Sequence, residues 1–148
     1  MLDKTLEEIY GRCRENFFRS VFFRIRERIG RLTAVEVFSL EVIRILGRPT
    51  ISEFARFIGV SQSGATYKID SLERKGYVRR ELSDQDKRES YLVLTEKYEA
   101  YGSIGSDYVS RVAERIREAF APDQVKKLEE LLGSVCREMT AENANRPM

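Results

Sequence analysis

Three consecutive segments decide the fold of this chain: LTAVEVFSLEVIRIL at 32–46, TISEFARFIGVSQSGATYKIDSLERKGYVRR at 50–80 and ELSDQDKRESYLVLTE at 81–96. The first segment and most of the second have apolar residues at helical spacing, interrupted by residues that start and stop helices. From the end of the second segment onward, strand-forming residues lie around a charged loop, as in a hairpin. The sequence therefore predicts three short helices followed by a two-stranded hairpin.

Two of the expected helices begin with the same capping pattern. Thr33 is followed three residues later by Glu36, and Thr50 by Glu53, so each pair can form a capping box in which each side chain bonds the other residue's backbone N–H. The first helix then carries an apolar stripe at Val37, Leu40, Ile43 and Leu46. Gly47 should end this helix, because glycine readily adopts the backbone conformation that terminates helices.

The third helix is predicted between Ser61, a capping residue, and Gly76, a residue that ends helices. Three apolar residues, spaced by four and then three positions, should pack inward: Ala65, Ile69 and Leu72. The rest of this helix is then free for other contacts through Gln62, Ser63, Thr66, Tyr67 and Lys68.

Strand-forming residues lie on both sides of the polar loop 83–88: Tyr77 and Val78 before it, and Tyr91, Val93 and Thr95 after it. A charged loop in this position is typical of a hairpin tip held away from the core. Three helices followed by such a hairpin are the order of a winged helix-turn-helix. We expect this domain over residues 32–97, in a chain that is mainly α with a small β-wing. The fold can place a short polar helix in a DNA major groove and the hairpin at its flank.

Long apolar stripes lie outside this segment, at both ends of the chain. Residues 1–31 carry one along a helix of about seven turns, and three phenylalanines widen it: Leu6, Ile9, Cys13, Phe17, Val21, Ile25 and Ile29, with Phe18, Phe22 and Phe23. Residues 98–148 carry two more stripes. The first is expected on a single helix and contains Tyr101, Tyr108, Val112, Ile116 and Phe120. The second is expected on a helix that begins at Pro122 and contains Val125, Leu128, Leu132, Val135 and Met139. Such stripes need a partner surface, which a second copy supplies, so 1–31 and 98–148 are predicted to form a helical dimerisation region. The polar tail from Thr140 is expected to fray.

An ordered set of short motifs in the central segment resembles one protein family. The motifs are LTxxE from Leu32, EFA at 53–55, VSQS at 60–63, IDxLERKGYV from Ile69, DKR at 86–88 and VLTE at 93–96. In this order they are similar to the MarR (multiple antibiotic resistance regulator) family. The resemblance implies a homodimeric bacterial transcription regulator whose third winged-helix helix enters the major groove, with the wing tip near the minor groove. It also implies release of DNA when a small aromatic or anionic effector binds. Lys97 and Tyr98 stand where the family commonly has glycine.

The expected DNA contacts come from the third helix and the wing tip. Short hydrogen-bonding side chains and one aromatic suit base edges and thymine methyl groups: Ser61, Gln62, Ser63, Thr66 and Tyr67. Two cations are expected nearer phosphates, Lys68 and Arg74. Three residues are expected at the wing, Asp86, Lys87 and Arg88, with Arg88 reaching the minor groove or its phosphates and Asp86 orienting it or bracing the hairpin. Gly64 allows two interpretations, close approach of the backbone to DNA or tolerance near the helix start. The expected partner is double-stranded DNA with a pseudo-palindromic operator.

Charge is unevenly distributed along the chain. The net charge is only +2, and residues 61–97 carry eight basic and seven acidic residues, so DNA affinity there must come from a few placed charges. Residues 12–31 carry seven Arg against two Glu, a local balance of +5. Three interpretations of this cluster are open: a second phosphate-contacting face, a pocket for an anionic ligand, or the solvated face of a long helix.

Several classes of protein are excluded by residues that the sequence lacks. The 148 residues contain no histidine, so Ser-His-Asp and Cys-His catalysis and histidine-rich zinc sites are ruled out. Neither a phosphate-cradling glycine loop nor a dinucleotide fingerprint occurs. We therefore expect no enzyme, no cofactor and no metal. No apolar run approaches the roughly 20 residues that span a bilayer, and the acidic N-terminus does not resemble a signal peptide, so we expect no membrane partner.

Two distant cysteines, Cys13 and Cys136, do not make a disulfide framework, which fits a reducing cytoplasm. Each is expected to be a small buried hydrophobe, although the positive charge of Arg12 and Arg14 beside Cys13 leaves a redox role open. The sequence thus favours a cytoplasmic, dimeric DNA-binding regulator, a repressor released by a small molecule. A thiol-based redox sensor of the same fold and a winged-helix protein-interaction module are the alternatives.

Overall fold

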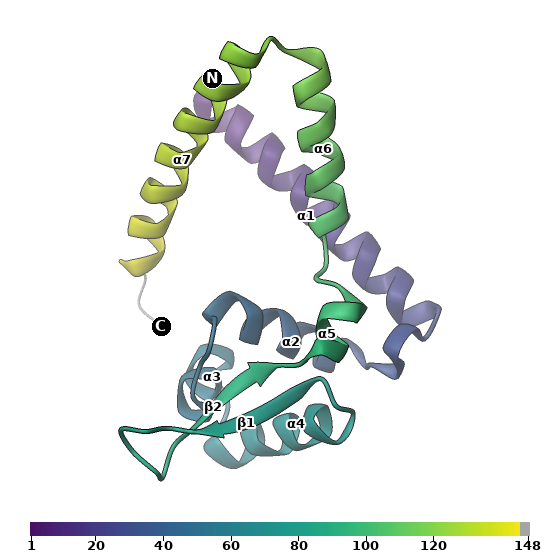
Figure 1. Cartoon of the computed structure of the whole chain (residues 1–148), viewed down its shortest axis with the longest axis vertical. Coiled ribbons are helices and arrows are strands. Elements are labelled where there is room, and N and C mark those ends of the chain that lie inside the picture. Colours follow the sequence, from purple (N-terminus) through teal and green to yellow (C-terminus); the bar gives the residue numbers. More distant parts are fainter. Residues whose placement is uncertain (146–148) are drawn as a thin grey trace. The chain divides into compact units, whose positions relative to one another are not determined.

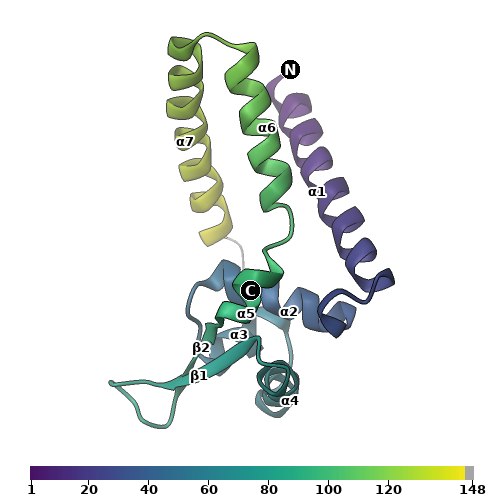
Figure 2. The same cartoon turned by 45° about the vertical axis from the view of Figure 1, so that its right-hand side comes forward.

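The computed structural model describes residues 1–145, which form two compact units, Met1–Gly105 and the residues from Ser106 onward (Figure 1). The first unit contains α1 (Leu2–Arg26), a short 3-10 helix η1 (Ile29–Arg31), α2 (Ala34–Leu46), α3 (Ile51–Ile58), α4 (Gln62–Arg74), β1 (Val78–Leu82), β2 (Ser90–Leu94) and α5 (Glu96–Tyr101). The second contains α6 (Ser106–Ala119) and α7 (Pro122–Ala144). The predicted fold class, mainly α with a small β-wing, is confirmed, and Figure 2 shows the loop between β1 and β2 extending beyond the neighbouring helices. None of the helices described is apolar over enough residues to cross a lipid bilayer.

Both predicted capping boxes are present. The Thr33 backbone N–H donates to Glu36 Oε2 at 2.7 Å, and the Glu36 N–H donates back to Thr33 Oγ1 at 3.3 Å. The corresponding distances for Thr50 and Glu53 are 2.8 Å and 3.1 Å. These bonds satisfy N–H groups that the first turn of a helix leaves without partners, so α2 and α3 start where the sequence predicts.

Helix α4 packs on the core through the predicted residues, because Ala65, Ile69 and Leu72 are fully buried. Its end is a Schellman motif: the Gly76 N–H donates to the Glu73 carbonyl at 2.9 Å and the Tyr77 N–H to the Leu72 carbonyl at 3.0 Å. Gly76 has a φ of +81°, a conformation that glycine adopts without a steric penalty. This turn leads directly into β1.

The wing is a hairpin attached to the start of α3. Strands β1 and β2 pair antiparallel, with Val78 opposite Leu94 and Leu82 opposite Ser90. The Leu92 N–H also donates to the Pro49 carbonyl at 2.8 Å, and an isolated bridge joins Thr50 to Tyr91. The chain segment before α3 therefore covers the outer edge of β2.

Helix α5 follows β2 and belongs to the first unit. Tyr98 is buried, and its hydroxyl donates to Glu41 Oε1 of α2 at 3.3 Å. The Lys97 ammonium donates to the Lys75 carbonyl at 2.7 Å and lies over the Tyr77 ring. The departure of Lys97 and Tyr98 from the family pattern thus leaves the wing intact and supplies two contacts that fasten α5.

The prediction that Tyr101 shares one helix with Tyr108 is wrong. Helix α5 ends at Tyr101, and Gly102 and Gly105, with φ of +79° and +89°, separate it from α6. Tyr101 instead packs edge-on against Tyr77, with ring centroids 5.8 Å apart. The contact with Tyr77 comes from the fold of the first unit, and apolar spacing alone does not reveal it.

Two helix ends also differ from expectation. The chain was expected to fray from Thr140, but α7 continues to Ala144, and the Thr140 hydroxyl donates to the Cys136 carbonyl at 2.9 Å. The last part of the predicted tail, 146–148, lies outside the described residues. Ile29 does not continue the stripe of α1, because Arg28 has a left-handed φ of 53° and starts η1.

Glu36 joins three parts of the first unit. It lies at the start of α2, is only 8% exposed, and accepts hydrogen bonds from Ser71 of α4 at 2.7 Å and from the Lys75 ammonium at 2.8 Å. Lys75 also donates to the Arg31 carbonyl at 2.9 Å. Burial raises the pKa of Glu36, but the hydrogen bonds from Lys75, Ser71 and Thr33 together outweigh it and lower the pKa from 4.5 to about 2.

This depressed pKa predicts an acid-sensitive fold. Because the folded state favours the Glu36 carboxylate, its contribution is complete above the unfolded pKa of 4.5 and disappears as pH falls towards about 2. The shift corresponds to about 3 kcal/mol. Urea unfolding between pH 7 and pH 2 should therefore show that Glu36→Gln is less stable at neutral pH and loses less stability on acidification. Glu53→Gln, which neutralises a capping carboxylate that holds no ion pair, should keep the wild-type pH dependence. Parallel pH profiles for wild type and Glu36→Gln would contradict the assignment.

Candidate nucleic-acid interface

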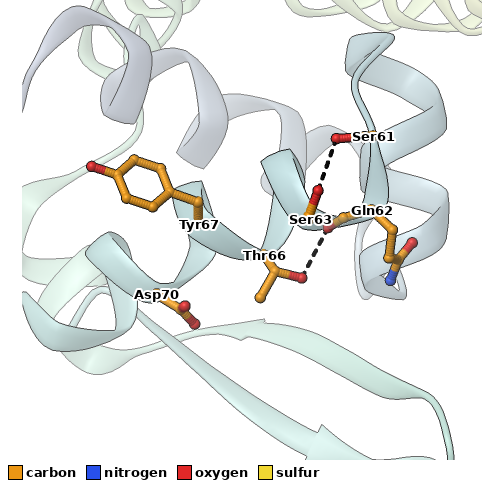
Figure 3. Close-up of a pocket in the computed structure, with 6 residues that line it drawn as sticks. All are labelled: Ser61, Gln62, Ser63, Thr66, Tyr67 and Asp70. Atoms are coloured by element: carbon orange, nitrogen blue, oxygen red, sulfur yellow. Dashed lines mark hydrogen bonds between the residues drawn. The ribbon is translucent and has the colours of Figure 1, made fainter.

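The outward side of α4 forms a shallow polar hollow beside the wing, here called the α4 hollow. Six residues line it: Ser61, Gln62, Ser63, Thr66, Tyr67 and Asp70 (Figure 3). The first five are the residues predicted to read base edges, and the structure brings them together. Tyr67 is 73% exposed, so its ring is available for contact. Asp70 was not predicted, although it follows Tyr67 by three positions and Thr66 by four and therefore lies on the same side of the helix.

Hydrogen bonds at the start of α4 orient the polar side chains. Ser61 Oγ accepts from the Gly64 N–H at 3.1 Å and lies 3.2 Å from Ser63 Oγ, while the Thr66 hydroxyl donates to the Gln62 carbonyl at 2.9 Å. The Ser52 hydroxyl of α3 donates to Gln62 Oε1 at 3.3 Å. Gln62 therefore keeps its NH₂ donors for a ligand, and Thr66 presents its methyl group and remaining lone pairs.

Gly64 has a local reason to be glycine besides the two interpretations from sequence. A Cβ at this position would lie 3.2 Å from Ser61 Oγ, the atom that caps α4. That separation is tight for a carbon atom, so a larger side chain would press on the cap.

The two predicted phosphate-contacting cations of α4 lie outside the α4 hollow. Lys68 is half-buried, and Arg74 is exposed in the last turn of the helix. Neither lines the hollow with the base-reading candidates. Their positions suit contacts to a backbone flanking the hollow rather than to bases within it.

At the wing tip, Asp86 contacts both the backbone and the side chain of Arg88. Asp86 Oδ1 accepts from the Arg88 N–H at 3.0 Å and from Arg88 Nε at 3.4 Å. The buried Ser83 hydroxyl in turn accepts from the Asp86 N–H at 3.3 Å. Arg88 is 92% exposed at its side chain, and Lys87 beside it is exposed as well. The tip therefore presents two cations from a hydrogen-bonded turn.

Two arginines that the sequence analysis missed fasten the wing. Arg80 of β1 donates to Asp70 Oδ1 and to Glu73 Oε2 of α4, each at 2.6 Å. Arg48 pairs with Glu81 and lies over the Tyr91 ring, 4.7 Å from its centroid. Asp70 and Glu73, three residues apart on α4, indicate that a cation pairs with them. That this cation is Arg80 of β1 follows only from the fold.

The arginine cluster of α1 is largely engaged within the chain. Arg19 pairs with Glu15 at 2.9 Å, and Arg12 lies 3.5 Å from Glu8, both on exposed helix surface. Arg24 donates to the Gly102 carbonyl at 2.8 Å and lies over the Tyr101 ring. These contacts favour the interpretation of the arginine cluster as the solvated face of a long helix. Arg24 differs from the others because it holds α1 to the segment around Tyr101.

Both cysteines are free and exposed in the single chain. The expectation that each cysteine is a small buried hydrophobe is therefore wrong for the single chain. The physical reason is that α1 and α7 each leave most of their apolar stripe unburied within their own unit.

A helix with a polar outward side, a preceding helix joined by a tight turn and a two-stranded wing with exposed cations at its tip define a winged helix-turn-helix protein. Residues 32–90 of the chain match the model of the MarR family. It is 32% identical over 100 residues to the uncharacterised HTH-type transcriptional regulator YkoM of Bacillus subtilis. This match covers 63% of the chain and about 60% of that relative's length.

Solved structures with the same fold include two at 21% identity. Transcriptional regulator Tm0710 from Thermotoga maritima has a TM-score of 0.64, with 98% of both chains covered. FabT from Streptococcus pneumoniae, solved in complex with DNA, has a TM-score of 0.58, with 95% of this chain and 96% of that one covered. At these identities the likeness concerns the fold.

Proposed function

We propose that this protein is a homodimeric, sequence-specific DNA-binding transcriptional regulator, and that it represses until a small aromatic or anionic effector releases it. The observation that carries the proposal is the α4 hollow, a set of small hydrogen-bonding side chains on the outward face of the recognition helix. The fold neighbour FabT was solved with DNA, which supports the same kind of partner. Such a regulator would act in the bacterial cytoplasm, where the operator DNA lies.

The chemistry of the α4 hollow suits the major groove. Gln62 offers amide donors to purine acceptors, while the Thr66 methyl group and the Tyr67 ring offer apolar contact to a thymine methyl. Lys68 and Arg74 would bind phosphates at its margin, and Arg88 would follow the adjoining minor groove or its backbone. Since residues 61–97 are almost neutral, these few cations must supply the electrostatic part of the affinity.

Exposed apolar side chains support a dimer. Phe22 of α1 is 67% exposed, and further large apolar residues lie in solvent on α1 and α7: Leu6, Ile9, Phe18, Phe23, Leu131, Leu132 and Met139. A soluble protein rarely leaves such surfaces uncovered. A second copy related by two-fold symmetry would cover them and would direct two α4 helices at half-sites about 10 base pairs apart.

The central experiment selects bound sequences from random duplex DNA and repeats the selection with Thr66→Ala and Tyr67→Ala. We expect the wild type to yield an inverted repeat and each variant to change the preferred base at a limited number of positions, because base contacts carry sequence information. Addition of small aromatic carboxylates to the wild-type complex then tests release. A wild-type selection without any consensus would refute the proposal, and unchanged preferences in both variants would refute the role of the α4 hollow.

The wing predicts a contact of a different kind. Arg88→Ala should weaken operator binding by about 1–3 kcal/mol if Arg88 makes a specific contact, whereas Lys87→Ala should weaken it less and in a more salt-dependent manner. Titrations at several salt concentrations measure both effects. Arg88→Ala binding as tightly as wild type throughout would rule out the contact.

The dimer can be tested with a matched pair of exposed phenylalanines. Phe22 lies on the stripe of α1, whereas Phe57 lies on α3, 47% exposed and outside both stripes. Phe22→Asp should shift sedimentation from dimer to monomer and reduce affinity for the full operator, because a charge would be buried at the interface. Phe57→Asp should remain dimeric. A wild-type monomer that binds a single half-site as tightly as the operator would exclude the dimer.

A further inference from the structure

Asp70 is the acidic residue of the α4 hollow and has no role in the function proposed so far. Figure 3 shows its carboxylate beside Thr66 on the outward side of α4. A carboxylate on a DNA-facing surface is repelled by phosphates, so an unneutralised acid would oppose binding. Its presence among neutral hydrogen-bonding side chains therefore needs a physical explanation.

Arg80 supplies the neutralising charge. One guanidinium nitrogen lies 2.6 Å from Asp70 Oδ1 and another 2.6 Å from Glu73 Oε2, and the Arg80 side chain is only 27% exposed. The pairing holds the Asp70 carboxyl in place from the side of the wing. Among the described residues Asp70 Oδ2 accepts no hydrogen bond, which leaves that oxygen for a ligand.

The position of Asp70 is within reach of the bases that α4 would read. From Ser61 to Asp70 the helix rises roughly 13 Å at 1.5 Å per residue. That length corresponds to about four base-pair steps of 3.4 Å. Asp70 lies at the end of the α4 hollow farthest along the helix from Ser61, so its target would be the base pair at one end of the half-site.

We propose that Asp70 is a specificity-determining residue that accepts a hydrogen bond from the exocyclic amine of cytosine or adenine in the major groove. This inference rests on the proposed function. A carboxylate only accepts hydrogen bonds, so it pairs with cytosine N4 or adenine N6 and is repelled by guanine O6 or thymine O4. Arg80 is then a positioning residue, because it acts on DNA through Asp70.

The experiment compares Asp70→Asn with Glu73→Gln. Both substitutions neutralise a carboxylate that Arg80 binds, but only Asp70 lines the α4 hollow. Affinities are measured for the full-length dimer on the selected operator and on every single base-pair variant of one half-site, with thermal unfolding as a check on folding. Asp70→Asn should reduce discrimination at one base pair roughly five- to tenfold, since Asn both donates and accepts. Glu73→Gln should leave the base preferences unchanged.

Two results would overturn the proposal. One is an equal loss of affinity for all operator variants in Asp70→Asn. The other is the same change of preference in Glu73→Gln, which would mean that both carboxylates act only by holding Arg80. Failure of the proposed function is distinguishable, because the wild-type protein would then select no sequence at all.

Discussion

Burial of one face of α4 is the constraint on which the rest of the structure depends. Ala65, Ile69 and Leu72 are fully buried, and residues at this spacing share one side of a helix. Burying them fixes the rotation of α4 about its axis, which turns the polar side outward and assembles the α4 hollow. The same packing sets the direction in which the chain leaves α4 after the Schellman turn at Gly76. Strand β1 therefore begins beside the helix whose carboxylates it binds.

Most of the charged side chains that contact α4 form ion pairs, and neither sign of charge is in large excess there. Glu36 holds Lys75, and Arg80 holds Asp70 and Glu73, at distances of 2.6–2.8 Å. Partly buried pairs of this kind fix the orientation of the groups they join, while desolvation offsets part of their attraction. These pairs also remove cations from the set that could attract phosphates. Arg88 at the wing tip is held by a turn rather than by burial, and its guanidinium stays exposed to solvent although Nε contacts Asp86 at 3.4 Å.

Local signals predicted most of the fold, and contacts between distant residues account for what was missed. The capping boxes at Thr33 and Thr50 depend on four neighbouring residues each, so the sequence alone locates them. Five of the six residues of the α4 hollow were predicted because a three-residue apolar pattern defines the opposite face. Asp70 was not predicted because a negative charge is unfavourable beside DNA unless a cation neutralises it, and that cation, Arg80, lies on the next strand. Tyr101 was assigned to the wrong helix because its packing against Tyr77 leaves no trace in apolar spacing.

The packing of α1 connects this helix to the start of the wing within the first unit. Of the residues described in α1, only Val21 is buried, so most of the apolar stripe of this helix is exposed in the single chain. Yet Arg24, near its end, donates to the Gly102 carbonyl and lies 4.3 Å from the Tyr101 ring centroid. Tyr101 packs on Tyr77, whose hydroxyl donates to the Gly30 carbonyl between α1 and α2 at 3.1 Å. Any tilt of α1 must therefore either break these contacts or move the segment that begins β1. The aromatic contacts of Tyr77 and Tyr101 thus couple the position of α1 to that of the wing within the first unit.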